Sequence, residues 1–164
     1  MNRVFVGTAV GVLIAAATLF EGGHAGAEQS TAALSNLQVS RATLDNGLRV
    51  VINQDRTVPT VAVSVYYDVG SRNEVKGRSG FAHLFEHMMF QGSANVGKGE
   101  HFSLIINRGG SANGTTSNDR TNYFETLPSN ELALGLWLEA DRMRSLAITQ
   151  ENFENQRMTV MEER

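Results

Sequence analysis

The chain has 164 residues, about the length of one domain, and its 41% hydrophobic and 19% charged residues are typical of a globular protein. A formal net charge of −3 leaves no basic stripe to neutralise phosphates, so we expect no nucleic-acid partner. The absence of cysteine excludes disulfides, thiolate catalysis and thiolate metal sites, so any metal must be held by imidazole and carboxylate groups.

Residues 1–27 have the pattern of a secretory signal peptide. Arg3 precedes an uncharged apolar run over residues 4–20, and the Ala-Gly-Ala sequence at residues 25–27 fits an A-x-A cleavage site. The alternative is a membrane-anchoring helix, but the run is short for a span and no cluster of charges follows it. We therefore expect cleavage after residue 27, a periplasmic or extracellular location, and no stable membrane anchor after signal cleavage.

Residues 28–37 are small and polar and are expected to form a linker. Residues 38–164 are expected to form an N-terminal domain that is incomplete. An Asp-Asn-Gly turn at residues 45–47 lies between two β-prone runs, which predicts a hairpin. Alternating valines in residues 61–67 predict a strand. Its second face is also partly apolar, which is typical of a central position in a sheet.

Further elements follow in chain order. We expect helices over residues 79–91 and 100–107, a second hairpin within residues 111–128, a helix from Ser129 to about Met143, and a last helix capped by Thr149. The predicted fold is α+β, an antiparallel-rich sheet with helices packed on one face. Because the last helix has no C-terminal cap, we expect the chain to be truncated within its domain.

The stretch "FAHLFEHMMF", residues 81–90, has two different faces when it is drawn as a helix. At about 100° per residue, its apolar side chains gather on one side and predict a core face of Phe81, Leu84, Phe85, Met88 and Met89. The opposite side carries His83, Glu86 and His87. Histidines four residues apart can reach one ion together, and H-x-x-E-H is a known catalytic pattern. The alternative is a solvated helix face with three polar residues.

The residue types on that face suit metal-assisted hydrolysis. Zinc accepts imidazole nitrogens at about 2.0–2.1 Å and lowers the pKa of a bound water to around 7. A carboxylate that is not itself a ligand can take the proton of that water. The position of Glu86, between the two histidines, suits this role.

The motif and its surroundings resemble the pitrilysin/insulinase zinc metallopeptidases, whose inverted zincin signature is H-x-x-E-H and which include the mitochondrial processing peptidase. Beyond "SGFAHLFEHMMFQGS", the resemblance extends to "TLDNGLRVVINQD", "VAVSVYYDVGSRNE", "GGSANGTTSNDRTNYFETLP" and "NQRMTVMEER". These blocks cover residues 41–164 in the family's order, and they resemble bacterial processing-peptidase-like members.

The resemblance implies one zinc ion per site, held by His83, His87 and a glutamate of the last helix, with Glu86 as general base. The family pattern puts the third ligand six residues after the arginine of the last helix, which is Glu163. Helical geometry agrees, because it turns the neighbouring candidate, Glu162, away from the buried side.

Two further sets of site residues follow from the resemblance. Many relatives carry a glutamate just before the arginine, in the outer shell of the metal site, where this chain has Gln156, an uncharged hydrogen-bonding group. The second hairpin is either a polar edge ribbon or, as in the family, an edge to which an extended peptide adds as a strand. In the second case Asn113, Gly114 and Thr116 are substrate-binding positions.

We therefore expect a zinc-dependent endopeptidase that hydrolyses peptides or unfolded protein segments with zinc-activated water and a glutamate base. The alternative is a non-catalytic assembly or binding subunit with the same fold, a class that has typically lost the zinc motif. The resemblance also implies a second homologous half domain, in the same longer chain or as a separate subunit, that activity requires. Outside the site, we expect Trp137 in the core and His101 at the surface or as a helix cap.

Overall fold

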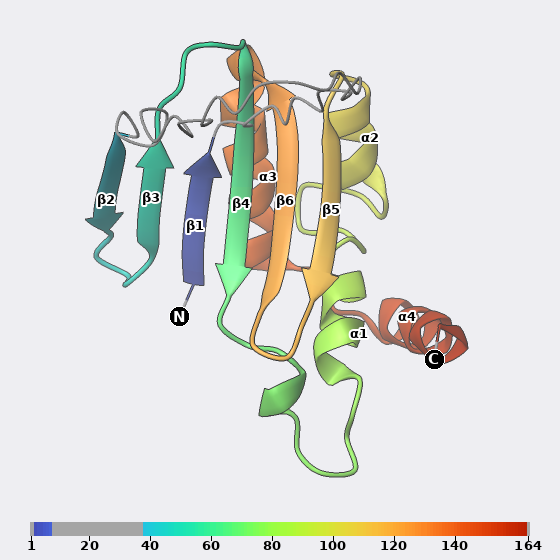
Figure 1. Ribbon diagram of the computed structural model, residues 1–164. Coiled ribbons are helices and arrows are strands. Elements are labelled where there is room, and N and C mark those ends of the chain that lie inside the picture. The colour runs from blue at the N-terminus through green and yellow to red at the C-terminus, as the bar shows by residue number, and fades with distance from the viewer. Residues whose placement is uncertain (1, 8–37, 164) are drawn as a thin grey trace, which may run out of the picture.

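The computed structural model describes residues 2–7 and 38–163, which form a six-stranded sheet with helices packed on it (Figure 1). The strands are β1 Asn2–Gly7, β2 Val39–Thr43, β3 Arg49–Asn53, β4 Thr60–Tyr67, β5 Ser111–Thr116 and β6 Thr121–Pro128. Their order is β2-β3-β1-β4-β6-β5, and every neighbouring pair is antiparallel except β1 with β3. The predicted α+β fold with an antiparallel-rich sheet is confirmed.

The helices lie along the half of the sheet that contains β4, β6 and β5. They are α1 Phe81–Met88, α2 Glu100–Ile106, α3 Leu132–Ser145 and α4 Gln150–Glu162, with short 3-10 helices at Ser71–Asn73 and Ser129–Glu131. α3 packs on β4 and β6, and in Figure 1 it lies behind them. α1 and α2 pack on β5, whereas α4 packs on α1. The edge strand β5 therefore lies next to the helix that carries the H-x-x-E-H motif.

Both hairpins form where the sequence predicts them. β2 and β3 pair through a turn in which Gly47 has φ of +83° and the N–H of Leu48 donates to Oδ1 of Asn46 at 3.0 Å. β4 lies between β1 and β6, and its valines alternate into the core, which confirms its central position. The buried core around it is formed by Val61, Val96, Ile105, Leu127 and Leu138.

Part of the predicted signal peptide forms a strand of the sheet. Asn2–Gly7, within the predicted signal peptide, forms β1 between β3 and β4. Its alternating valines are β-prone, and its backbone pairs with strand edges that would otherwise lack partners in the sheet. The rest of the predicted signal peptide and the linker at residues 28–37 lie outside the described residues. Among the described residues, no helix is both long and apolar enough to cross a membrane.

Helix ends differ from the sequence expectation by a few residues. α1 is shorter than residues 79–91, because it begins after Gly80, whose φ is +94°. The carboxylate of Glu74 accepts the N–H groups of Gly80 and Ala82 at 2.9 Å each and so caps α1 from a preceding loop. Ser129 lies in a 3-10 turn and does not cap α3, which begins at Leu132. Thr149 does cap α4, by accepting the N–H of Asn152 at 3.1 Å.

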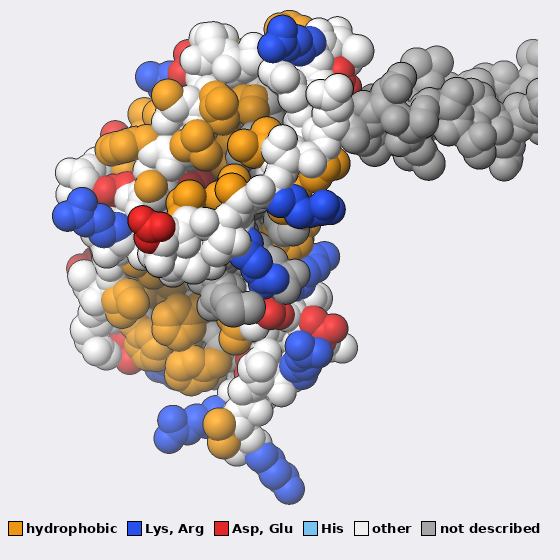
Figure 2. Space-filling model, turned by 90° about the vertical axis from the view of Figure 1, so that its left-hand side faces the viewer, with side chains coloured by type: hydrophobic (Ala, Val, Ile, Leu, Met, Phe, Trp, Pro, Cys, Tyr) orange, Lys and Arg blue, Asp and Glu red, His pale blue; other side chains and the backbone are white. Residues whose placement is uncertain are grey.

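The burial of several side chains was predicted wrongly. Phe81 and Phe85 are 44% and 42% exposed, because α1 presents only Leu84 and Met88 as buried residues. The two phenylalanines line an open cavity of about 450 Å³. Trp137 is 45% exposed on α3, whereas its neighbour Leu138 is buried. In Figure 2, which views the molecule from the β2 side, hydrophobic side chains gather in exposed patches.

Candidate metal centre

Three donor atoms from α1 and the end of α4 converge on one point. Nε2 of His83 and Nε2 of His87 are 3.2 Å apart, and Oε2 of Glu163 lies 3.4 Å from the first and 3.5 Å from the second. Three donors arranged tetrahedrally around zinc at about 2.0–2.1 Å would be separated by about 3.3 Å. The triangle therefore fits a zinc ion with three protein ligands and one position open for water.

Packing between α1 and α4 brings these donors together. Leu84 and Met88 on α1 form a buried cluster with Val160 on α4, and Phe153 packs against it. Glu163 directly follows α4, and its N–H still donates to the carbonyl oxygen of Thr159 at 3.2 Å. The exposed residue before it, Glu162, is not among the converging groups.

Gln156 lies behind the ligands and contacts one of them. Its Oε1 is 3.2 Å from Nδ1 of His87, and its Nε2 donates to Oδ1 of Asn155 at 2.7 Å. Because an amide oxygen only accepts hydrogen bonds, Nδ1 of His87 must carry the proton. Nε2 of His87 then presents a lone pair to the metal position.

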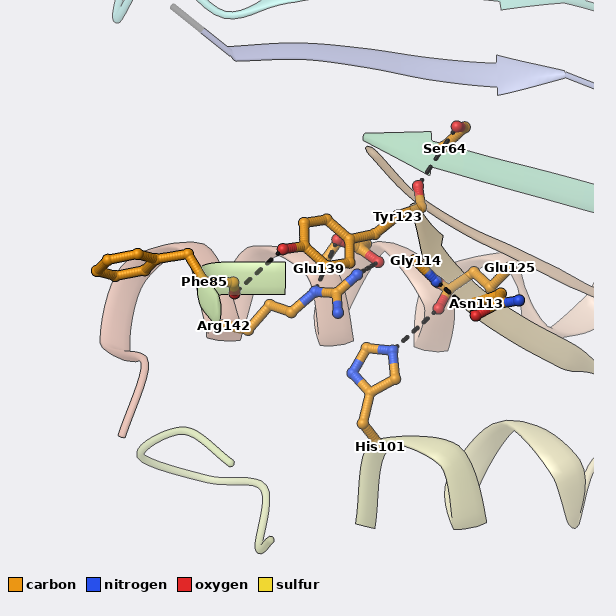
Figure 3. A network of polar contacts seen from close by, with 9 residues as sticks. All are labelled: Ser64, Phe85, His101, Asn113, Gly114, Tyr123, Glu125, Glu139 and Arg142. Carbon is orange, nitrogen blue, oxygen red and sulfur yellow. Dashed lines mark hydrogen bonds and ion pairs between the residues drawn. The ribbon is translucent and has the colours of Figure 1, made fainter. Parts of the chain in front are cut away.

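Glu86 lies beside the metal ligands and bonds to β5. Its Oε2 is 2.5 Å from Oγ1 of Thr116, and it does not belong to the converging triangle. Gly114 is buried on the face of β5 toward α1, where a Cβ would lie 3.2 Å from Cγ of Glu86. Asn113 is exposed, and its Oδ1 accepts the N–H of Gly114 at 2.8 Å (Figure 3). Of the three predicted substrate-binding residues, two therefore have their side-chain positions directed at α1.

A buried polar network behind β5 was not predicted from the sequence. His101 on α2, Glu125 on β6, and Glu139 and Arg142 on α3 are each at most 4% exposed (Figure 3). Nε of Arg142 donates to Oε2 of Glu139 at 3.0 Å, and its Nη2 donates to Oε1 of the same residue. Nε2 of His101 is 3.3 Å from Oε2 of Glu125. The expected surface position of His101 is therefore wrong.

This network is a poor candidate for a second metal ion, although His101, Glu125 and Glu139 are close enough to share one. The guanidinium of Arg142 already neutralises Glu139 and would repel a cation. Burial raises the pKa of Glu125 to about 7, partly offset by Arg142. Burial also lowers the pKa of His101 to about 4. A neutral histidine therefore faces a carboxyl group that is half protonated near neutral pH.

The sequence did hold a signal for part of this network. Residues 123, 125 and 127 share one face of a strand, and Tyr123 and Leu127 are apolar enough to predict that this face is buried. Glu125 between them is then an inward-facing carboxylate. The structure confirms that it is buried.

Tyr123 connects the network to the motif helix. Its hydroxyl donates to the carbonyl oxygen of Phe85 at 3.3 Å, next to Glu86 (Figure 3). The guanidinium of Arg142 lies 4.4 Å from the centre of the Tyr123 ring. The ring of Phe90 packs against the Tyr123 ring in an edge-to-face arrangement, with 5.6 Å between the ring centres. These contacts hold α1 against the sheet.

Comparison with known proteins identifies related sequences. The model of the family described as Insulinase (Peptidase family M16) matches residues 49–164. The chain is 40% identical over 123 residues to zinc protease PqqE of Helicobacter pylori, covering 74% of this chain and 28% of that protein. It is 31% identical over 132 residues to the mitochondrial-processing peptidase subunit beta of Blastocladiella emersonii, covering 80% of this chain and 28% of that protein.

Solved structures show the same relationship. The crystal structure of a protease from Helicobacter pylori superposes with a TM-score of 0.75 at 40% identity, over 78% of this chain and 31% of that one. The crystal structure of pitrilysin gives a TM-score of 0.69 at 25% identity, over 74% of this chain and 13% of that one. The chain thus spans less than a third of the length of these relatives.

Proposed function

We propose, from the premise that this chain belongs to the insulinase family of peptidases (peptidase family M16), that it carries the catalytic zinc site of an endopeptidase. Its substrates would be peptides or unfolded protein segments. The observation that carries the proposal is the triangle of His83, His87 and Glu163, whose separations of 3.2 to 3.5 Å suit tetrahedral zinc.

Each residue of the site has a distinct role in this proposal. When bound, zinc supplies Lewis-acid chemistry and lowers the pKa of a water ligand to around 7. Glu86 takes a proton from the attacking water and passes it to the leaving amine. Gln156 keeps His87 in the tautomer that binds metal. β5 is an edge strand of the described sheet, and its edge at Asn113, Gly114 and Thr116 holds an extended peptide as an added strand.

The proposal includes a second homologous half domain, in the same chain or as a separate subunit. It is supported by the length of the related proteins, of which this chain covers 28% in two cases. It also includes export, supported by Arg3, the apolar run that follows and the Ala-Gly-Ala sequence at residues 25–27. Cleavage after residue 27 would remove strand β1 from its place between β3 and β4. N-terminal sequencing of the exported protein should begin at Glu28, and a retained Met1 would contradict cleavage after residue 27.

Metal content and peptide hydrolysis test the proposed function together. We expect the wild-type protein and Glu86→Gln to bind one zinc per site, with hydrolysis lowered by about 10²–10⁴-fold only in the variant, because a general base contributes about that much. Glu163→Gln should lose zinc. The matched change Glu162→Gln, at the exposed neighbouring carboxylate, should keep both zinc and activity.

Two outcomes would contradict the proposal. Zinc in neither wild-type protein nor Glu86→Gln would make the motif an ordinary polar helix face and favour the non-catalytic binding subunit. Equal hydrolysis by both proteins would remove Glu86 from the mechanism.

A further inference from the structure

The edge strand β5 holds the carboxylate of Glu86 through a single side chain. Oγ1 of Thr116, the last residue of β5, lies 2.5 Å from Oε2 of Glu86. The hydroxyl of Thr116 donates this bond, and the carboxylate oxygen of Glu86 accepts it. Hydrogen bonds to ionised groups are shorter and about twice as strong as neutral ones. This bond is therefore able to fix the orientation of the carboxylate.

Among the described residues, two oxygen atoms lie within reach of the Thr116 hydroxyl as acceptors, and Oε2 of Glu86 is the nearer one. Oγ1 of Thr121, opposite Thr116 in the β5–β6 pairing, lies 3.5 Å away. The hydroxyl of Thr121 already donates to the carbonyl oxygen of Val69 at 3.0 Å, and Thr121 is only 4% exposed. Thr121 can therefore only accept a hydrogen bond from Thr116, and the shorter distance, 2.5 Å to Glu86 against 3.5 Å to Thr121, favours donation by Thr116 to Oε2 of Glu86.

The backbone at Gly114 restricts the side chain of Glu86 near its Cγ atom. A Cβ at this position would lie 3.2 Å from Cγ of Glu86 and 3.2 Å from the ring of Phe90, so Glu86 packs closely on the strand backbone. Among the described residues, Oε2 is the oxygen of Glu86 that receives a hydrogen bond. The other oxygen, Oε1, is left for proton transfer.

We propose that Thr116 is a positioning residue for Glu86: its hydroxyl holds Oε2, so that Oε1 is the oxygen that exchanges protons with the substrate and water. This inference rests on the proposed function, in which Glu86 is the general base. It gives the side chain of Thr116 a role different from the substrate contact that the sequence resemblance implied. The backbone of β5 remains available for a peptide strand.

The test compares two substitutions in the protein that contains this chain and its second half. Thr116→Val removes the hydroxyl and keeps the branched shape, and we expect it to lower kcat by about 10- to 100-fold, because small misplacements of reacting groups have effects of this size. KM and zinc content should stay unchanged. Thr116→Ser keeps the hydroxyl and should restore most of kcat.

A matched control is available on the neighbouring strand. Thr126 on β6 pairs with Ser111, at the opposite end of β5 from Thr116, and Thr126→Val should retain the wild-type kcat. Wild-type kcat in Thr116→Val would overturn the inference. A raised KM with unchanged kcat would also overturn it, in favour of a substrate contact, and failure of Thr116→Ser to restore kcat would point to shape rather than the hydroxyl.

A structural measurement separates this inference from the proposed function. Crystal structures should show the Glu86 carboxylate beside residue 116 in wild type and Thr116→Ser, and displaced in Thr116→Val. An undisplaced carboxylate in Thr116→Val overturns the positioning role even if the enzyme is active. Equal hydrolysis by wild type and Glu86→Gln would defeat the proposed function, whereas the position of Glu86 would still decide whether Thr116 holds it.

Discussion

The contact between His87 and Gln156 shows how one neutral side chain can fix the tautomer and orientation of a candidate metal ligand. Gln156 is 8% exposed, and its Oε1 faces Nδ1 of His87 at 3.2 Å. Groups behind a metal ligand fix its tautomer and ring orientation, and their loss weakens metal affinity. Gln156 supplies this support without placing a negative charge behind the ligands.

At the residue scale, Gln156→Leu is therefore expected to weaken zinc binding by about 10- to 100-fold. The leucine fills a similar volume but cannot accept the Nδ1–H of His87. Titration of the metal-free protein with zinc, in competition with a chelator, measures the dissociation constant. Gln150→Leu, the same change at an exposed position on α4, serves as the control. Equal dissociation constants for Gln156→Leu and wild type would remove the supporting role.

At the element scale, the buried network joins α2, β6 and α3 behind the motif helix. Its four residues, which are at most 4% exposed, are His101, Glu125, Glu139 and Arg142. Truncating one partner of such a network leaves a buried group without its hydrogen bonds, which is costly. Through Tyr123, which contacts both Arg142 and the carbonyl of Phe85, this network also supports the position of α1.

The network predicts a pH dependence of stability. Burial raises the pKa of Glu125 from 4.5 to about 7, so between these values the folded protein holds a proton that the unfolded chain has released. The contribution of Glu125 to the free energy of unfolding is greatest below about pH 4.5, and it decreases as the pH rises toward 7. His101 contributes the opposite slope, because burial lowers its pKa from 6.5 to about 4, and stability rises with pH between those values.

Glu125→Gln isolates the glutamate contribution. The free energy of unfolding of the variant relative to wild type should increase between pH 5 and pH 8, by up to about 3 kcal/mol at about 1.4 kcal/mol per pKa unit. Urea unfolding at several pH values measures it. Gln150→Glu, an exposed site where a carboxylate is added, should show almost no such slope. A difference that stays constant with pH would show that Glu125 is ionised in the folded protein.

At the scale of the whole molecule, the described residues expose several large apolar side chains. Trp137 on α3 is 45% exposed, and Met158 and Met161 on α4 are 55% and 61% exposed. Relatives in the family are more than three times as long as the matched region. Met158 and Met161 are three residues apart and so lie on one face of α4, and an exposed apolar patch can mark contact with another part of a protein. This agrees with the proposed second half domain.

We therefore expect this chain alone to bind zinc but to hydrolyse peptides at least ~100-fold more slowly than the protein with its second half, because substrate positioning would be incomplete. Mixing the chain with a separately purified second half, followed by a peptide cleavage assay, measures the gain. Efficient cleavage by the isolated chain would show that one half is sufficient. The Glu86→Gln form of the chain serves as the inactive control.

Much of the fold and part of the site were determined by local sequence. The hairpin at residues 45–47, the alternation in β4 and the Thr149 cap each depend on residues close together in the chain. The spacing of His83 and His87 likewise follows from one helical turn. Periodicity and turn chemistry encode such contacts directly.

Only the tertiary structure decided which side chains meet across elements. The bond from Thr116 to Glu86, the burial of His101 against Glu125, and the exposure of Trp137 depend on how α1, α2 and α3 pack on the sheet. β1 pairs with strands more than forty residues away in sequence. A helical or alternating pattern says which face of an element is apolar, but not which neighbour covers that face or how far it reaches. Long-range packing settles those contacts, and with them the orientation of the candidate base.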